Sequence, residues 1–236
     1  MKSVFTILFT VFLLFTTKAQ VWFEVGGKAM YGMKGFYNNN VFNDRDHQYQ
    51  FGSGLGYGGV LCINIADRNG FNIEALSASN EQKFEYNNTN VNDLEWKTLD
   101  LYLLYRAYSN SAFIEIGPKY SKVNSITQSY GSTNYNLDGE YQDQYFSAVF
   151  GFGGLITGSE FLTLKSGVRF EYALGDFVSA KGKDTGYPTV YLQTPYDTYA
   201  ATHPFSASVY LSLNFAIGAV AKAECGKRRF IFGSGY

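Results

Sequence analysis

Residues 205–217 read F-S-A-S-V-Y-L-S-L-N-F-A-I, and this stretch decides the fold. Apolar side chains fill every second position, and the positions between them carry mainly Ser, Tyr and Asn. Strict alternation predicts a β-strand, because successive side chains of a strand point to opposite faces. The run is longer than the usual strand of roughly five or six residues. One apolar face and one small, polar face are what a strand needs when it crosses a bilayer and lines a polar interior.

The overall composition agrees with this interpretation. Charged residues make up 17% of the chain, below the roughly 25% that is usual for soluble domains. Aromatic residues make up 18%, and 25 residues are Gly. An exported chain rich in Tyr, Phe and Gly fits a membrane barrel with aromatic girdles at both interfaces. The net charge of -1 offers no basic excess, so we expect no nucleic-acid partner.

The N-terminus has the features of an export signal. Lys2 is followed by an apolar run from Val4 to Phe15, and Ala19 precedes the polar Gln20. This order is typical of a secretory signal peptide, with cleavage after Ala19. The apolar run is too short for a transmembrane helix, which takes about 20 residues.

Eight segments show the strand pattern: residues 21–37, 51–65, 71–86, 96–108, 112 to beyond 123, 144–156, 161–177 and 205–217. Long connections follow the odd-numbered segments. Short ones, such as the turn at Asn69-Gly70, follow the even-numbered segments. This layout predicts an all-β, eight-stranded antiparallel up-and-down transmembrane β-barrel with short periplasmic turns and long extracellular loops. Pro118 predicts a bulge or an irregular pairing in the fifth strand, because Pro has no N–H to donate.

A soluble eight-stranded barrel would show the same alternation with its apolar face inside. The low charge content favours the membrane barrel, because a soluble exterior needs more charge. We therefore expect a signal peptide at 1–19, an outer-membrane barrel at 20–220 and a periplasmic tail at 221–236. Both chain ends of the mature protein then lie in the periplasm.

Charged side chains recur on the face opposite the apolar one. Five are acidic and five are basic, and all are expected to point inward: Glu24, Lys28, Glu74, Asp100, Arg106, Glu115, Lys119, Lys165, Arg169 and Glu171. Side chains can fill the interior of a barrel of about eight strands. An unpaired buried charge costs several kcal/mol, so we expect these groups to form ion pairs that plug the lumen. The alternative is a narrow channel or a proton path.

Two cysteines remain, Cys62 and Cys225. An exported chain can join them as a disulfide if both lie near the same rim. The alternative is two free thiols, one facing the interior and one in the tail.

The sequence contains no catalytic motif of the G-x-S-x-G, H-E-x-x-H or C-x-x-C type. Its two histidines, His47 and His203, are both expected in outer loops. His47 follows Asp44 and Asp46, and this D-R-D-H run is either a weak metal site or a solvated loop. We expect no enzyme activity and no cofactor.

Two segments offer binding surfaces. The long loop at 180–203 carries tyrosines that form either a contact surface or part of the outer girdle: Tyr187, Tyr191, Tyr196 and Tyr199. The tail places a basic patch before a short apolar strand: Lys227, Arg228, Arg229, Phe230 and Phe232. Such a tail could dock on a partner by strand addition. Disorder, or plugging of the near mouth of its own barrel, is the alternative.

The leader ending in Ala-Gln, the Gly- and Tyr-rich alternating strands and the closing S-V-Y-L-S-L-N-F together resemble the small outer-membrane β-barrels of Bacteroidota, the PorT-like family. This resemblance implies an outer-membrane location in contact with lipid and lipopolysaccharide. It also implies a non-enzymatic accessory subunit of an envelope complex for protein export or outer-membrane assembly, with other envelope proteins as partners. The alternatives are a free-standing structural or surface-binding barrel and, less favoured, a narrow channel.

Overall fold

The computed structural model describes residues 21–44, 47–65, 68–86, 89–130, 133–159, 161–184 and 198–217. The expected signal peptide and the expected tail lie outside these ranges. The helices, strands and contacts counted below all belong to these residues.

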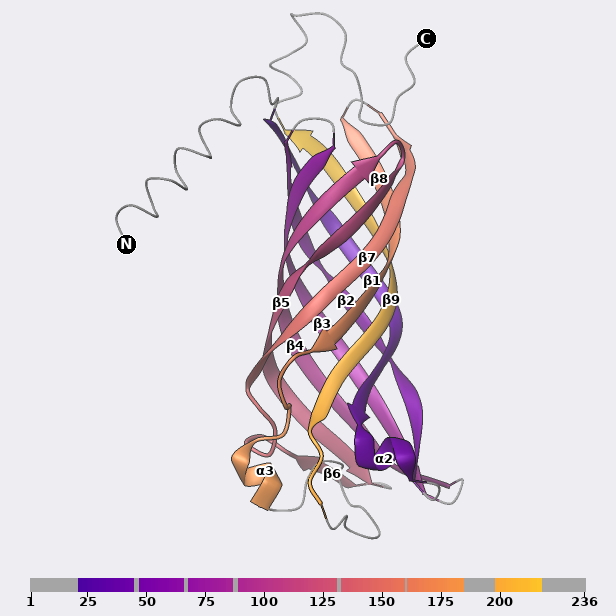
Figure 1. Cartoon of the computed structure of the whole chain (residues 1–236), viewed down its shortest axis with the longest axis vertical. Coiled ribbons are helices and arrows are strands. Elements are labelled where there is room, and N and C mark those ends of the chain that lie inside the picture. The colour runs from indigo at the N-terminus through magenta and orange to yellow at the C-terminus, as the bar shows by residue number, and fades with distance from the viewer. Residues whose placement is uncertain are drawn as a thin grey trace, which may run out of the picture.

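Eight antiparallel strands close into a ring (Figure 1). In chain order they are β1 (Val21–Asn38), β2 (His47–Ile65), β3 (Asn69–Tyr86), β4 (Thr89–Ser109), β5 (Ala112–Tyr130), β7 (Gln144–Gly158), β8 (Leu162–Ala173) and β9 (Thr202–Ile217). Each strand pairs with its neighbour in sequence, and β9 pairs back onto β1 through a register that runs from Phe23–Ile217 to Asn38–Thr202. The predicted up-and-down barrel is therefore confirmed.

Three short elements lie outside the ring, at the end away from Val21 and Ile217 (Figure 1). Helix α2 (Asn39–Asn43) follows β1, and helix α3 (Ala180–Asp184) lies between β8 and β9. Strand β6 (Thr133–Asn136) pairs only with the end of β5. None of the described helices is long and apolar enough to cross a membrane.

Several strands are longer than the sequence pattern predicted. Strand β4 already begins at Thr89 instead of 96, and it pairs with β3 from there. Strand β5 continues to Tyr130, and β9 begins at Thr202, which places His203 in a strand rather than in a loop. The connection between β8 and β9 begins earlier than expected, because β8 ends at Ala173 instead of 177. The hydrogen-bonded strands extend beyond the residues that alternate between apolar and polar, because polar side chains are tolerated on both faces where a strand leaves the bilayer.

Strand β5 shows two separate irregularities, an interrupted ladder at Pro118 and a register shift farther along the strand. Around Pro118 the pairing with β4 skips from Ile116 to Lys119 without a change of register, and the pairing of Pro118 with Ala148 on β7 is regular. The register shift itself lies closer to the loops, between the pairs Thr98–Val123 and Lys97–Ser125. Pro118 therefore interrupts the ladder without bulging it.

The two faces of the sheet differ as the alternation predicted. Along β9 the odd-numbered apolar residues from Val209 to Ile217 are exposed, and the even-numbered Tyr210, Ser212 and Asn214 are buried. The same division holds in the other long strands, where large apolar side chains point out and charged side chains are buried. This arrangement is the reverse of a soluble barrel, whose apolar face lies inside.

Candidate functional site

The interior of the barrel is the most densely charged region that the structure describes. It brings together all ten side chains that the sequence placed there: Glu24, Lys28, Glu74, Asp100, Arg106, Glu115, Lys119, Lys165, Arg169 and Glu171. Each one is buried, and each one lies within an ion-pair distance of an opposite charge. The pairs fall into three groups along the barrel.

The central group is built around Arg169 of β8. Its guanidinium contacts Glu74 of β3 at 2.9 Å and Glu115 of β5 at 2.7 Å. Glu74 also accepts a hydrogen bond from Lys28 of β1 at 2.5 Å, and Glu115 accepts one from Arg106 of β4 at 2.7 Å. Side chains from five strands thus meet in this group, and four of these strands are not adjacent to β8 in the ring.

The second group lies closer to the loop end. Lys119 contacts Glu171 at 2.6 Å and Asp100 at 3.6 Å. The Tyr102 hydroxyl donates to Glu171 at 2.9 Å. Lys34, which sequence reasoning missed, joins this group through a 3.9 Å contact with Glu171. Its even position in β1, in phase with Lys28, is the signal that could have found it.

The third group lies at the end where the chain enters and leaves the barrel. Lys165 contacts Glu24 at 2.6 Å, and Asn64 donates to the other oxygen of Glu24 at 3.3 Å. Cys62 is a buried free thiol on the inner face of β2. Its proposed disulfide partner, Cys225, lies outside the described residues.

Aromatic rings lie close to the buried cations. Lys28 lies 4.1 Å from the ring centre of Tyr210, and Arg106 lies 4.2 Å from that of Phe113. Arg169 is 4.8 Å from the ring of Tyr102. Such contacts are worth about 2 kcal/mol or more when they are shielded from water. They offset part of the cost of removing these charges from water.

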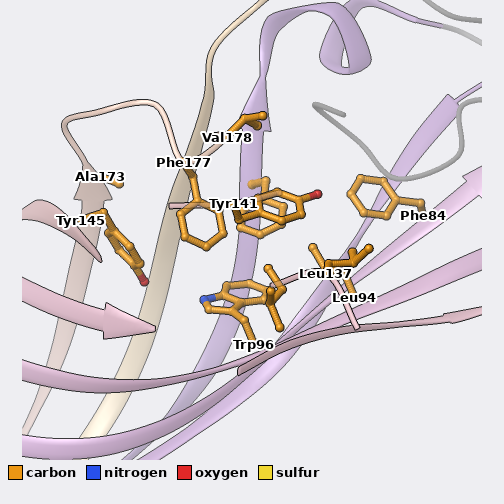
Figure 2. Packing of buried hydrophobic residues seen from close by; sticks show 11 residues of the cluster. Phe84, Leu94, Trp96, Leu137, Tyr141, Tyr145, Ala173, Phe177 and Val178 are labelled. Atoms are coloured by element: carbon orange, nitrogen blue, oxygen red, sulfur yellow. The ribbon is translucent and has the colours of Figure 1, made fainter. Parts of the chain in front are cut away.

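An apolar cluster fills the interior at the loop end (Figure 2). We call it the mouth cluster, and it consists of Phe36, Phe84, Leu94, Trp96, Ile126, Leu137, Tyr141, Tyr145, Ala173, Phe177 and Val178. Trp96 stacks on Phe36 with ring centres 4.6 Å apart, and Phe177 lies 5.4 Å from Phe36. Phe177 and Val178 come from the β8–β9 connection, so a loop folds back into the barrel.

Backbone hydrogen bonds hold this connection over the mouth. Phe177 donates to Thr202 at 2.8 Å and accepts from Gln142 at 2.8 Å, and Tyr141 forms a bridge with Val178. Asp176 accepts from the amides of Val178 and Thr202, each at 3.1 Å. The loop end of the barrel is therefore closed by packed and hydrogen-bonded side chains.

The Asp176 carboxylate is the polar anchor of this cap. It contacts Lys183 of α3 at 2.9 Å and accepts a hydrogen bond from the Tyr199 hydroxyl. Partial burial acts to raise the pKa of Asp176, but the hydrogen bonds from Tyr199, Lys183 and the two amides outweigh it and lower the pKa. Burial, and then the neighbouring carboxylate, raise the pKa of Tyr199.

Comparisons with known proteins identify similar folds only. No family model and no curated protein matches the chain. Among solved structures, Neisserial surface protein A is 13% identical, with 80% of this chain and 96% of that one covered and a TM-score of 0.40. OprG of Pseudomonas aeruginosa is 12% identical, with 85% and 97% covered and a TM-score of 0.40. The attachment invasion locus protein Ail of Yersinia pestis is 9% identical, with 82% and 98% covered and a TM-score of 0.34.

The chain is similar to small surface and outer-membrane barrels. The barrel architecture stands on the closed ring of strands itself.

Most of the residues expected to bind a partner lie outside the described ranges. These are Tyr187, Tyr191, Tyr196, Lys227, Arg228, Arg229, Phe230 and Phe232. Tyr199 is described. Its hydroxyl is bound to Asp176, Lys183 lies 4.9 Å from its ring centre, and the residue is 46% exposed. Tyr199 therefore anchors the cap and still presents part of its ring to the outside.

Of the two histidines, only His203 has a side chain that the structure describes, and that side chain is engaged in the barrel wall. His203 donates from Nδ1 to the carbonyl of Ala173 at 3.0 Å and stacks on Tyr172. The backbone of His47 belongs to β2, whereas its side chain and Asp46 lie outside the described part. No group of three His, Cys, Asp or Glu side chains within that part could hold a metal ion.

Proposed function

We propose that the protein is an integral outer-membrane barrel that does not conduct and that acts through its surfaces, as an accessory subunit of an envelope complex for protein export or outer-membrane assembly. The observation that carries this proposal is the combination of an apolar exterior with an interior filled by ion pairs and closed by the mouth cluster. Periplasmic chain ends and envelope-protein partners are part of the same proposal.

The exterior supports the membrane location. Large apolar side chains such as Leu101, Ile116, Phe150 and Leu211 are exposed all round the ring, on β4, β5, β7 and β9. Exposed apolar surface of this extent is unfavourable in water and favourable in hydrocarbon. With the short turns in the periplasm, the capped mouth faces outward.

The interior supports a structural role. Glu24, Glu74, Glu115 and Glu171 each lie within 2.9 Å of a cation. A general base needs a free carboxylate within reach of a substrate proton, and these carboxylates are buried and neutralised. Binding to other molecules therefore falls to the lipid-facing wall, the loops and the tail.

A free-standing surface-binding barrel is the second candidate. The observation that favours it is a set of exposed aromatic side chains around the loop end, Phe42, Tyr135 and Tyr199. Exposed aromatic rings are the anchors that protein interfaces use most effectively.

Planar-bilayer recording of the purified protein tests the closed interior. We expect no steady conductance above the bilayer baseline. Stable openings of nanosiemens size would contradict the closed barrel and favour the channel.

Affinity purification in mild detergent separates the two surface roles. We expect a tagged wild-type protein to recover envelope proteins in stoichiometric amounts, and a variant without residues 221–236 to lose some of them. Recovery of the bait alone by both forms would discard the accessory subunit in favour of the free-standing barrel.

A further inference from the structure

The charges in the described interior do not cancel. Five carboxylates on the strands face six cations: Lys28, Lys34, Arg106, Lys119, Lys165 and Arg169. A sixth buried carboxylate, Glu140, lies between β6 and β7 and pairs with Lys181 outside the lumen. Lys165 balances Glu24, and Lys34 with Lys119 balances Asp100 with Glu171. The excess therefore belongs to the central group, where three cations meet two carboxylates. An excess positive charge in a low-dielectric interior costs several kcal/mol unless an anion compensates it.

Both carboxylates of the central group are already hydrogen-bonded to its cations. Glu115 accepts from both Arg169 and Arg106, and Glu74 accepts from Arg169, Lys28 and the amide of Asn72. Two hydrogen-bond donors in and beside this group, by contrast, remain unbonded. The Nε of Arg106 and the hydroxyl of Tyr210 are buried and have no hydrogen-bond partner. Both residues are only 2% exposed.

These two donors belong to the same electrostatic environment. The Tyr210 ring lies between Lys28, at 4.1 Å, and Arg169, at 5.0 Å from its centre. Its hydroxyl end covers Gly167 of β8, where a Cβ would come within 2.7 Å of it. The Arg106 guanidinium lies 4.2 Å from the centre of the Phe113 ring, and the tip of that ring covers Gly153, the β7 partner of Gly167. These two glycines leave room for both rings to reach into the lumen, so the two donors lie in the same part of it.

We propose that the central group binds one small inorganic anion, of the chloride class, between the Arg106 Nε and the Tyr210 hydroxyl. Two unpartnered donors and a surplus positive charge are the requirements of such a site, and a cation would meet repulsion there. The narrow interior of an eight-stranded barrel admits a single ion rather than a phosphate ester. The anion completes the charge balance of the plug. The site rests on the ion pairs of the central group and is independent of the accessory role and of its partners.

Anomalous diffraction locates the anion directly. Crystals of the whole protein grown in sodium bromide are expected to show a bromide peak in contact with the Arg106 Nε and the Tyr210 hydroxyl. A map without an anomalous peak at this position, including one in which only a water molecule bridges the two donors, would overturn the proposal.

Thermal unfolding in detergent provides the second test. The wild-type midpoint is expected to be about 3 °C higher in sodium chloride than in sodium gluconate of equal ionic strength, since the anion binds only the folded barrel. Tyr210→Phe removes the donor and keeps the ring, so the difference should disappear. Lys28→Met removes the surplus charge, and the same loss is expected.

The matched control is Tyr105→Phe. Tyr105 precedes Arg106, points outward and bonds Asn69 instead of an interior group. Its variant should keep the full chloride effect. Equal wild-type midpoints in the two salts, or an unchanged difference in Tyr210→Phe, would contradict the site. If Lys28→Met fails to fold, Tyr210→Phe and the bromide map still decide the question.

Discussion

Arg169 shows how a single residue can join distant strands. Its guanidinium forms two hydrogen bonds with Glu74 and two with Glu115, and these carboxylates stand on β3 and β5. The planar fork of Arg suits this bidentate geometry, which the point charge of Lys cannot reproduce. The central group is therefore held mainly by one side chain from β8.

Replacement of this side chain is predicted to be costly. We expect Arg169→Met to lower the free energy of unfolding by about 3 kcal/mol, because both carboxylates lose their bidentate partner while Lys28 and Arg106 remain. Urea unfolding in lipid vesicles measures the change. Lys122→Met is the control, since Lys122 is exposed and should alter stability by less than about 0.5 kcal/mol. A loss for Arg169→Met as small as that of the control would show that the central group contributes little.

The alternation of the sequence predicted which charged side chains face inward, because facing depends only on odd or even position in a strand. It could not predict which charges pair. Arg169 and Glu74 meet only because the ring closes through β9 and β1, and such register is set by pairing between distant segments. Lys34 was missed because Gly32 and Gly35 interrupt the alternation around it.

The β8–β9 connection is an element whose role the sequence did not reveal. Phe177 was assigned to a strand, yet it lies beyond β8 and packs into the mouth cluster. We expect Phe177→Ala to loosen the cap and to admit water around Trp96. The emission of Trp96, recorded in a Trp22→Phe background, should shift to longer wavelength while the barrel remains folded. An unchanged spectrum would show that the strand-borne aromatics seal the mouth alone.

The cap should also respond to pH through Asp176. Because hydrogen bonds lower its folded-state pKa, its contribution is complete above the unfolded value of about 3.9 and is lost as the pH falls through the folded value. Asp176→Asn is expected to reduce stability by about 1 kcal/mol at pH 7 and to speed amide exchange at Val178 and Thr202. The difference in urea midpoint from wild type should vanish in acid.

The control for this pH effect is Asp138→Asn. Asp138 is an exposed loop carboxylate bonded to Asn136, and its loss should leave both amides protected. A difference between Asp176→Asn and wild type that stays constant down to the lowest pH would assign the effect to packing rather than to the carboxylate.

The mouth cluster marks the limit of the sequence pattern. In the middle of the strands, most inward positions are polar or charged, although a few apolar residues such as Leu76 and Leu104 lie among them. This contrast with the apolar outward face makes the strands recognisable in the sequence. Beyond this middle part, inward positions such as Phe36 and Trp96 become apolar, because the loops there supply apolar partners instead of ions. The positions of those partners depend on the tertiary fold of the loops, which local alternation does not encode.

For the molecule as a whole, the location of charge and apolar surface is inverted relative to a soluble protein. Ion pairs occupy the centre, and apolar side chains cover the outside of the ring. Such a barrel is stable only where hydrocarbon surrounds it, because contact between that apolar exterior and water has an unfavourable free energy. The membrane is therefore part of the folded state.

Two substitutions on β9 test this dependence. Leu211 and Ile217 are almost equally exposed, at 52% and 50%. Leu211 lies within the length of β9, where the bilayer is expected to cover it, and Ile217 is the last residue of the strand. In a bilayer, Leu211→Arg should cost about 2–4 kcal/mol and Ile217→Arg only about 0–1 kcal/mol, because the penalty depends on depth. Reversible unfolding in vesicles measures both. On a barrel surrounded by water the two variants would behave alike, so equal and small effects would contradict the membrane location.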